Sequence, residues 1–118
     1  MSGDDRPSAI RRGDVIWASK NPTTVREQAG DRPWLVLSND VQHQAVELLI
    51  VVPLTRSDRG WATHVRVGTL PGGGAQVAMC EQVQSMSIRR ARRVDPTPYP
   101  VDVVDQVHSI LTKLTARR

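Results

Sequence analysis

Cysteine and long apolar runs are what this chain of 118 residues most lacks. Its one cysteine, Cys80, cannot form an internal disulfide or a cysteine-based zinc site, so a reducing cytoplasm is the simplest setting. The longest apolar stretch, Leu48 to Leu54, contains Pro53 and is too short to cross a membrane. The polar and acidic stretch from Met1 to Ala9 does not resemble a secretory signal. These absences predict a cytoplasmic protein without a membrane segment.

Lysine is also scarce, because Lys20 and Lys113 are the only lysines among 16 basic residues. The others are arginines, and 12 acidic residues leave a net charge of +4. Arginine presents a flat, permanently charged group that pairs with phosphate oxygens and stacks on bases. The bias therefore favours a nucleic-acid partner, although a GC-rich genome would produce the same bias without any function.

The length and the spacing of apolar residues predict one small β domain, residues 11–118, behind a disordered leader, residues 1–10. Short apolar or alternating stretches predict strands, and turns rich in Gly and Pro separate them. No helix is expected between these strands, so a small antiparallel barrel or sandwich is the expected architecture. The first expected strand directly follows Gly13. The others cover residues 34–38, 45–54, 63–67, 76–80 and 83–87.

The period changes in the last segment, where the sequence predicts a helix over about residues 100–115. Apolar residues recur there at spacings of three and four, which places them on one face of a helix. Asp102 lies near its start and Lys113 near its end, so both charges complement the helix dipole. The apolar residues are Val103, Val104, Val107, Ile110, Leu111 and Leu114.

A long polar connection, residues 19–31, lies between two of the expected strands. Long connections in compact domains are often functional. This one delivers Arg32 just before Pro33, whose fixed φ angle would anchor the arginine at the mouth of a strand. A guanidinium held there could face a phosphate. Thr55 follows another apolar strand, and its hydroxyl could donate to the same phosphate.

Five short blocks stand out between Arg12 and Val83. They are Arg12-Gly13-Asp14-Val15-Ile16-Trp17, Glu27-Gln28-Ala29-Gly30-Asp31-Arg32-Pro33, Leu35-Val36-Leu37-Ser38-Asn39-Asp40, Val51-Val52-Pro53-Leu54-Thr55 and Cys80-Glu81-Gln82-Val83. In this order the blocks resemble the MazF/PemK (Kid)-type toxins, the endoribonucleases of type II toxin–antitoxin systems. The resemblance implies an SH3-like antiparallel barrel with a C-terminal helix, the fold shared by CcdB and PemK toxins. It also implies a homodimer that binds a cognate antitoxin chain.

The resemblance implies a toxin that cuts single-stranded RNA at specific sequences and inhibits translation and growth until its antitoxin neutralises it. A 2′-hydroxyl would attack its own neighbouring phosphate, which leaves a 2′,3′-cyclic phosphate and a 5′-hydroxyl. No metal or other cofactor is implied, because the nucleophile is already covalently adjacent. Arg32 and Thr55 match the family's catalytic residues, so Arg32 would stabilise charge on the phosphorane and Thr55 would donate a hydrogen bond to it.

The residue that moves the proton is left open by the sequence. Arginine is a poor base, because its pKa lies far above neutral, so a carboxylate is the better candidate. Glu27 and Glu81 are equally good candidates by position. PemK relatives carry Arg-Cys-Asp-Gln where this chain has Met79-Cys80-Glu81-Gln82, so the acid role of that arginine would fall to Arg32 or to water.

Further side chains around these residues are expected to contact RNA. Arg26 takes the place of a histidine of PemK relatives, Trp61 could stack on a base, and His64 could touch the RNA. The full expected set is Arg26, Gln28, Trp61, His64 and Gln82. No spacing unites His43, His64 and His108 as a two-histidine ribonuclease site or as a set of metal ligands.

The densest charge in the chain is the stretch Arg89-Arg90-Ala91-Arg92-Arg93, named here the arginine cluster. It is either a solvated edge or a surface for phosphates or an acidic antitoxin tail. Two other functions fit the same barrel. A CcdB-like gyrase poison would end in Trp-Gly-Ile, whereas this chain ends in Thr115-Ala116-Arg117-Arg118. A non-catalytic RNA-binding barrel would have no need of both Arg32 and Thr55.

Overall fold

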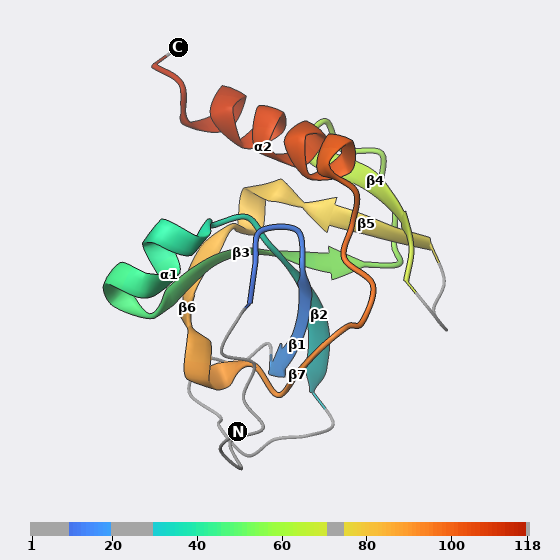
Figure 1. Cartoon of the computed structure of the whole chain (residues 1–118). Helices are drawn as coiled ribbons and strands as arrows, with labels where there is room; N and C mark the ends of the chain where they lie inside the picture. The colour runs from blue at the N-terminus through green and yellow to red at the C-terminus, as the bar shows by residue number, and fades with distance from the viewer. Residues whose placement is uncertain (1–9, 20–29, 71–74, 118) are drawn as a thin grey trace.

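The structure is a computed structural model that describes residues 10–19, 30–70 and 75–117. Its strands form one seven-stranded antiparallel sheet that curls strongly, and a long C-terminal helix lies across one end (Figure 1). The elements are β1 (Val15–Ser19), β2 (Asp31–Val36), α1 (Asp40–Val46), β3 (Leu48–Thr55), β4 (His64–Thr69), β5 (Ala75–Met79), η1 (Cys80–Gln82), β6 (Gln84–Ser87), η2 (Ile88–Arg90), β7 (Arg93–Val94) and α2 (Val101–Thr115).

Strand β3 organises the sheet, because it pairs with three other strands. Residues 51–53 pair with β2, residues 48–51 with β6, and the last two, Leu54 and Thr55, with β5. The order β4-β5-β3-β2-β1-β7 therefore ends at β4 and β7, and no ladder between described residues joins those two ends. The expected fold class is confirmed, with a barrel-like sheet that stays open between β4 and β7.

The central residues of β1 to β3 are mostly buried on both faces of the sheet, which explains the apolar runs within these strands. Successive side chains of a strand point to opposite faces. Val15, Leu35 and Val52 belong to one core cluster, while their chain neighbours Ile16 and Val51 belong to the other. The strands that carry Arg32 and Thr55 are thus packed between two hydrophobic cores.

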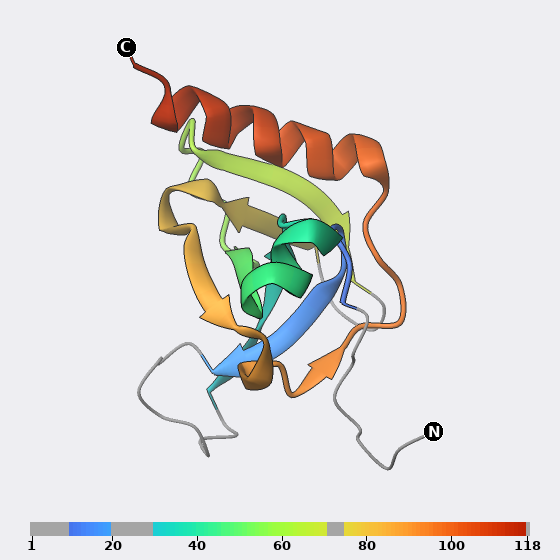
Figure 2. The same cartoon turned by 60° about the vertical axis from the view of Figure 1, so that its left-hand side comes forward.

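Helix α2 covers the first of these cores, and it lies along β4 (Figure 2). Val104 and Val107 are fully buried, and Ile110 and Leu111 pack beside them, as their spacing predicts. Leu114 departs from that prediction, because 45% of it is exposed. Arg12 also ties the chain before β1 to the helix through an ion pair of 3.1 Å with Asp105.

Helix α1 corrects the sequence prediction, which placed no helix between the strands and began a strand at residue 45. The strand begins at Leu48 instead, after Glu47 takes a left-handed conformation with a φ of 56°. His43 holds α1 in place because its ring bonds the Ser38 Oγ at 2.7 Å and the Ile10 carbonyl oxygen at 2.8 Å. His43, a polar residue, occupies a buried position of α1, and this hides the apolar period that would have revealed the helix.

The expected leader falls almost wholly outside the described residues. Its last residue, Ile10, is described and is already buried in a core cluster. Within the described ranges, no helix has both the length and the apolar character that a membrane span requires.

Candidate active site

Arg32 and Thr55 come together because β2 and β3 pair in antiparallel register. Trp34 pairs with Pro53. Arg32 lies two residues before Trp34 and Thr55 lies two residues after Pro53, so they stand opposite each other where β2 begins and β3 ends. The Arg32 Nη2 donates to the Leu54 carbonyl oxygen at 3.0 Å, and burial lowers the pKa of the guanidinium. No carboxylate in the described part of the chain pairs with Arg32, so its charge is fixed in place yet available to a ligand.

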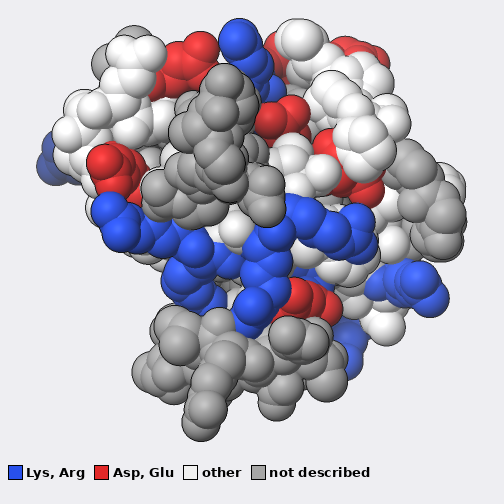
Figure 3. All heavy atoms as spheres, turned by 60° about the horizontal axis from the view of Figure 1, so that its bottom comes forward, with Lys and Arg blue, Asp and Glu red and all other residues white. Residues whose placement is uncertain are grey.

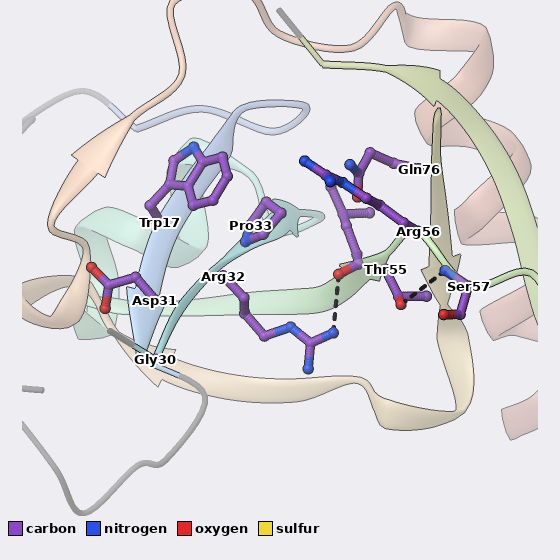
Figure 4. A pocket seen from close by; sticks show the side chains of 10 residues that line it. Trp17, Gly30, Asp31, Arg32, Pro33, Thr55, Arg56, Ser57 and Gln76 are labelled. Atoms are coloured by element: carbon purple, nitrogen blue, oxygen red, sulfur yellow. Dashed lines mark hydrogen bonds between the residues drawn. The ribbon is translucent and has the colours of Figure 1, made fainter. Parts of the chain in front are cut away.

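Two hollows flank this pair, and Arg32, Thr55 and Ser57 line both of them. The first, named the Glu81 hollow, is lined by Arg32, Thr55, Ser57, Arg59, Trp61, His64, Met79, Glu81 and Gln82. The second, named the Trp17 hollow and drawn in Figure 4, is lined by Trp17, Gly30, Asp31, Arg32, Pro33, Leu54, Thr55, Arg56, Ser57 and Gln76.

Glu81 is held at the rim of the Glu81 hollow by two side chains. The Thr63 hydroxyl donates to Oε1 at 2.7 Å, and the His64 Nε2 lies 3.1 Å from Oε2. Partial burial raises the pKa of Glu81, but the bonds from Thr63, from its own backbone amide and from His64 outweigh it and lower the pKa overall. Glu81 is therefore ionised at neutral pH, and each of its oxygens has further lone pairs for a ligand.

An aromatic pair also lines the Glu81 hollow. The Trp61 ring lies 4.9 Å from the His64 ring, tilted by 35°, and half of Trp61 is exposed. The Arg59 guanidinium lies 5.8 Å from the Trp61 centroid. Only 3% of the His64 side chain is exposed, and its Nδ1 has no partner among the described residues. The hollow thus combines an exposed aromatic face, a carboxylate and fixed positive charge.

Comparison with known proteins places the chain in a family. The model of the PemK-like, MazF-like toxins of type II toxin–antitoxin systems matches residues 11–115. The chain belongs to this toxin family. It is 35% identical to the endoribonuclease toxin MazF of Escherichia coli strain K12 over 77 residues, 65% of this chain and 68% of that protein. It is also 29% identical to the endoribonuclease PemK of Escherichia coli over 114 residues, 91% and 86% of the two chains.

Solved toxin structures show the same fold. MazF from Deinococcus radiodurans superposes with a TM-score of 0.70 at 28% identity and covers 94% of this chain and 97% of its own. The MazE–MazF complex from the same organism gives 0.71 at 25% identity, over 98% and 100%. A mycobacterial endoribonuclease bound to its cognate antitoxin gives 0.72 over 89% and 93%, but at 17% identity that likeness supports the fold alone.

Within this toxin family fold, every expected site residue that the structure describes lines the Glu81 hollow. They are Arg32, Thr55, Glu81, Trp61, His64 and Gln82. Arg26, Glu27 and Gln28 lie outside the described residues, so their expected roles stay predictions. Sequence reasoning did not include Thr63 or Arg59. His64 pairs with Met79 across β4 and β5, and this pairing brings the start of β4 close to Glu81. The sequence could reveal this proximity only if the strand register were known.

The histidines do not converge on one site. His43 is a buried residue of α1, and His108 lies on the exposed side of α2, so only His64 reaches the Glu81 hollow. In the described ranges, no group of three or more His, Cys, Asp or Glu side chains is arranged to hold a metal ion.

The arginine cluster is largely engaged in contacts within the chain. Arg90 donates to the Ser19 carbonyl oxygen at 2.7 Å, Arg92 pairs with Asp31 at 3.1 Å, and Arg93 lies 4.4 Å from the Trp17 ring centroid. Arg89 is the exception in the cluster, because its side chain only approaches Glu47, at 4.0 Å. Basic side chains nevertheless form a nearly continuous band on one face of the molecule (Figure 3). The cluster therefore joins η2 and β7 to the ends of β1 and β2 while it adds to the positive charge of the surface.

Proposed function

We propose that this chain is a toxin endoribonuclease that cuts single-stranded RNA at the Glu81 hollow, without a metal ion. The observation that carries the proposal is the arrangement of Arg32 and Thr55, which face one hollow together with an ionised carboxylate. Membership of the toxin family, and the endoribonuclease names of its relatives, support the same activity.

The reaction begins when a 2′-hydroxyl attacks the adjacent phosphate, with loss of its proton and departure of the 5′-oxygen. Negative charge grows on the phosphoryl oxygens as the phosphorane forms. The Arg32 guanidinium, fixed by the Leu54 carbonyl, stabilises that charge without first having to reorganise. The Thr55 Oγ1 accepts the Ser57 amide at 3.2 Å, which leaves its own hydrogen to donate to the phosphate. The departing 5′-oxygen takes a proton from water or from Arg32, so the products are a 2′,3′-cyclic phosphate and a 5′-hydroxyl.

Glu81 is our candidate for the proton acceptor. It is ionised and it borders the hollow, and Thr63 and His64 hold its two oxygens in place. A carboxylate with a lowered pKa is a weak base, so the gain here comes from orientation rather than from basicity. Glu27 is the alternative base, and the comparison of Glu81→Gln with Glu27→Gln decides between them.

Cleavage in the presence of EDTA tests the proposal. Purified protein should cut single-stranded RNA, leave DNA of the same sequence intact, and yield 3′ ends that carry a cyclic phosphate. Mapping the cut sites on a long natural RNA would define the sequence recognised. Activity that disappears with chelation and returns with magnesium would contradict the mechanism, and RNA binding without cleavage would favour the non-catalytic alternative.

We further propose that the toxin acts in the cytoplasm as a symmetric homodimer neutralised by a cognate antitoxin. Large apolar side chains are exposed around β3 and η1, which include Leu48 at 38%, Ile50 at 39% and Val83 at 36%. Contiguous exposed apolar surface is typical of protein interfaces. Light scattering should report twice the 13.1 kDa of the single chain at micromolar concentration, and a monomer would contradict the dimer.

A further inference from the structure

The Trp17 hollow is the part of the site region that the proposed reaction leaves unused. It meets the Glu81 hollow at Arg32 and Thr55, so the two hollows lie on either side of the residues that would hold the cut phosphate. An RNA chain that presents one phosphate to Arg32 must continue in both directions from it. The Trp17 hollow therefore lies where a neighbouring nucleotide would be accommodated.

The walls of this hollow have the chemistry that a nucleotide needs. Trp17 and Pro33 lie side by side as cross-strand partners of β1 and β2 and present flat apolar surface. Arg56 extends from the end of β3 back toward Pro33, with Trp17 across the hollow (Figure 4). Arg56 is exposed and makes no hydrogen bond or ion pair with any described residue. A base can stack on aromatic and apolar surface, and a guanidinium without a partner can donate hydrogen bonds to a phosphate.

Among the described residues that line the hollow, the one carboxylate, Asp31, is already neutralised. Asp31 pairs with Arg92 at 3.1 Å, so it adds little repulsion toward a phosphate. The position of the Trp17 ring is also fixed, because Arg93 lies 4.4 Å from its centroid. Arg92 and Arg93 of the arginine cluster thus hold Asp31 and Trp17, which both line the Trp17 hollow. Sequence reasoning treated the cluster as a surface patch. The indole Nε1 of Trp17 is buried and has no hydrogen-bond partner among the described residues.

We propose that the Trp17 hollow is a second nucleotide subsite, in which the base next to the cut phosphate lies against Trp17 and Pro33 while Arg56 contacts the phosphate beyond it. This inference rests on the proposed RNA cleavage at Arg32. It adds that binding of the RNA on one side of the cut depends on Trp17 and Arg56, and on the other side on the Glu81 hollow.

Base removal combined with mutation tests the subsite. The RNA is the shortest oligonucleotide that the wild-type protein cuts, with an abasic nucleotide introduced at each position flanking the cut. For wild-type protein, the abasic change at the seated position should lower kcat/KM roughly 5- to 100-fold, the range expected for loss of one stacked base. The Trp17→Leu protein should be insensitive to that change but should retain the full penalty for the abasic change on the opposite side.

A second arm avoids any folding defect of the Trp17 variant, because Arg56 is exposed. A neutral methylphosphonate at the phosphate beyond the seated base should lower kcat/KM of the wild-type protein and not of Arg56→Gln. Arg117→Gln is the matched control, since Arg117 is an exposed arginine outside both hollows, and it should retain the wild-type penalty.

The outcomes separate the subsite from the reaction. If neither variant changes the penalty at any position while the wild-type protein cuts RNA, the subsite is wrong and the proposed function stands. If the wild-type protein does not cut RNA at all, the proposed function itself fails, and the subsite with it.

Discussion

Arg32 and the arginine cluster hold positive charge in two different ways. The cluster is the densest charge in the chain, yet Arg90, Arg92 and Arg93 are committed to a carbonyl, a carboxylate and an indole ring. Arg32 is a single half-buried residue near the start of β2, and among the described residues only the Leu54 carbonyl oxygen and the face of Trp34 hold it. Charge density in a sequence therefore indicates where a chain is basic, whereas fixed and uncompensated charge indicates where chemistry can occur.

The largest effect should come from Arg32→Ala. Loss of the guanidinium removes a preorganised donor to the transition state, so the single-turnover cleavage rate should fall roughly 100- to 1,000-fold. RNA affinity should change much less, because the arginine cluster and Arg56 still contribute charge. Rapid-quench kinetics at saturating RNA, with Arg117→Gln as the charge-matched control, would measure this. Full cleavage by Arg32→Ala would place the active site elsewhere.

Thr55→Ala should cost a similar factor, again roughly 100- to 1,000-fold, since it removes the other donor. Thr55→Ser is the matched control. It keeps the hydroxyl that accepts the Ser57 amide, so it should retain most of the rate. Equal losses in both variants would mean that the methyl group or the local backbone matters rather than the hydroxyl.

Glu81→Gln should lower the cleavage rate roughly 100-fold, at the lower end of the range for proton transfer by a positioned side chain. Because the pKa of Glu81 is lowered, the wild-type rate should lose this contribution only when the pH falls below the usual range of a glutamate. The same sign applies to stability: the bonds to Glu81 stabilise the fold at neutral pH and are lost as acid protonates it. Rate profiles of Glu81→Gln and Glu27→Gln across pH would identify the base, and an unchanged Glu81→Gln profile would assign that role to Glu27.

The smallest effect on rate should come from the arginine cluster. Replacing Arg89, Arg90, Arg92 and Arg93 by Gln together should weaken RNA binding and reduce its salt dependence by about 0.7 in logarithmic slope for each phosphate that the variant no longer neutralises. The rate at saturating RNA should stay within a few-fold of wild type, and the melting temperature should fall because Asp31 and Trp17 lose their partners. A rate loss as large as that of Arg32→Ala would erase the distinction between the two regions.

Sequence patterns predicted the parts of this molecule that follow a simple period. The spacing of apolar residues in α2 and the alternation of Val65, Arg66 and Val67 in β4 both appear in the structure. The α1 helix was not predicted because His43, a polar residue, occupies one of its buried positions. The β3 strand was extended too far back because nothing in the sequence marks the left-handed turn at Glu47.

The candidate site, like the fold, could be predicted only in part from the sequence. Arg32 and Thr55 were expected from the resemblance and from their places beside strands. Their mutual approach depends on the register of β2 with β3, which the sequence does not display. Trp17 was not among the expected site residues, and its place in a hollow next to Arg32 becomes visible only when Pro33 is seen as its cross-strand partner.

A single 2′-deoxy substitution tests the central claim most directly. Once the cut site is mapped, one oligonucleotide is made with deoxyribose only at the nucleotide whose 2′-hydroxyl would attack, and its cleavage is followed in EDTA beside the all-ribose strand. The account predicts that the wild-type protein binds both strands with similar affinity and cuts only the all-ribose one at that phosphate. Cleavage of the deoxy-substituted strand at the same phosphate would contradict it, because the nucleophile would then have to come from water or from the protein.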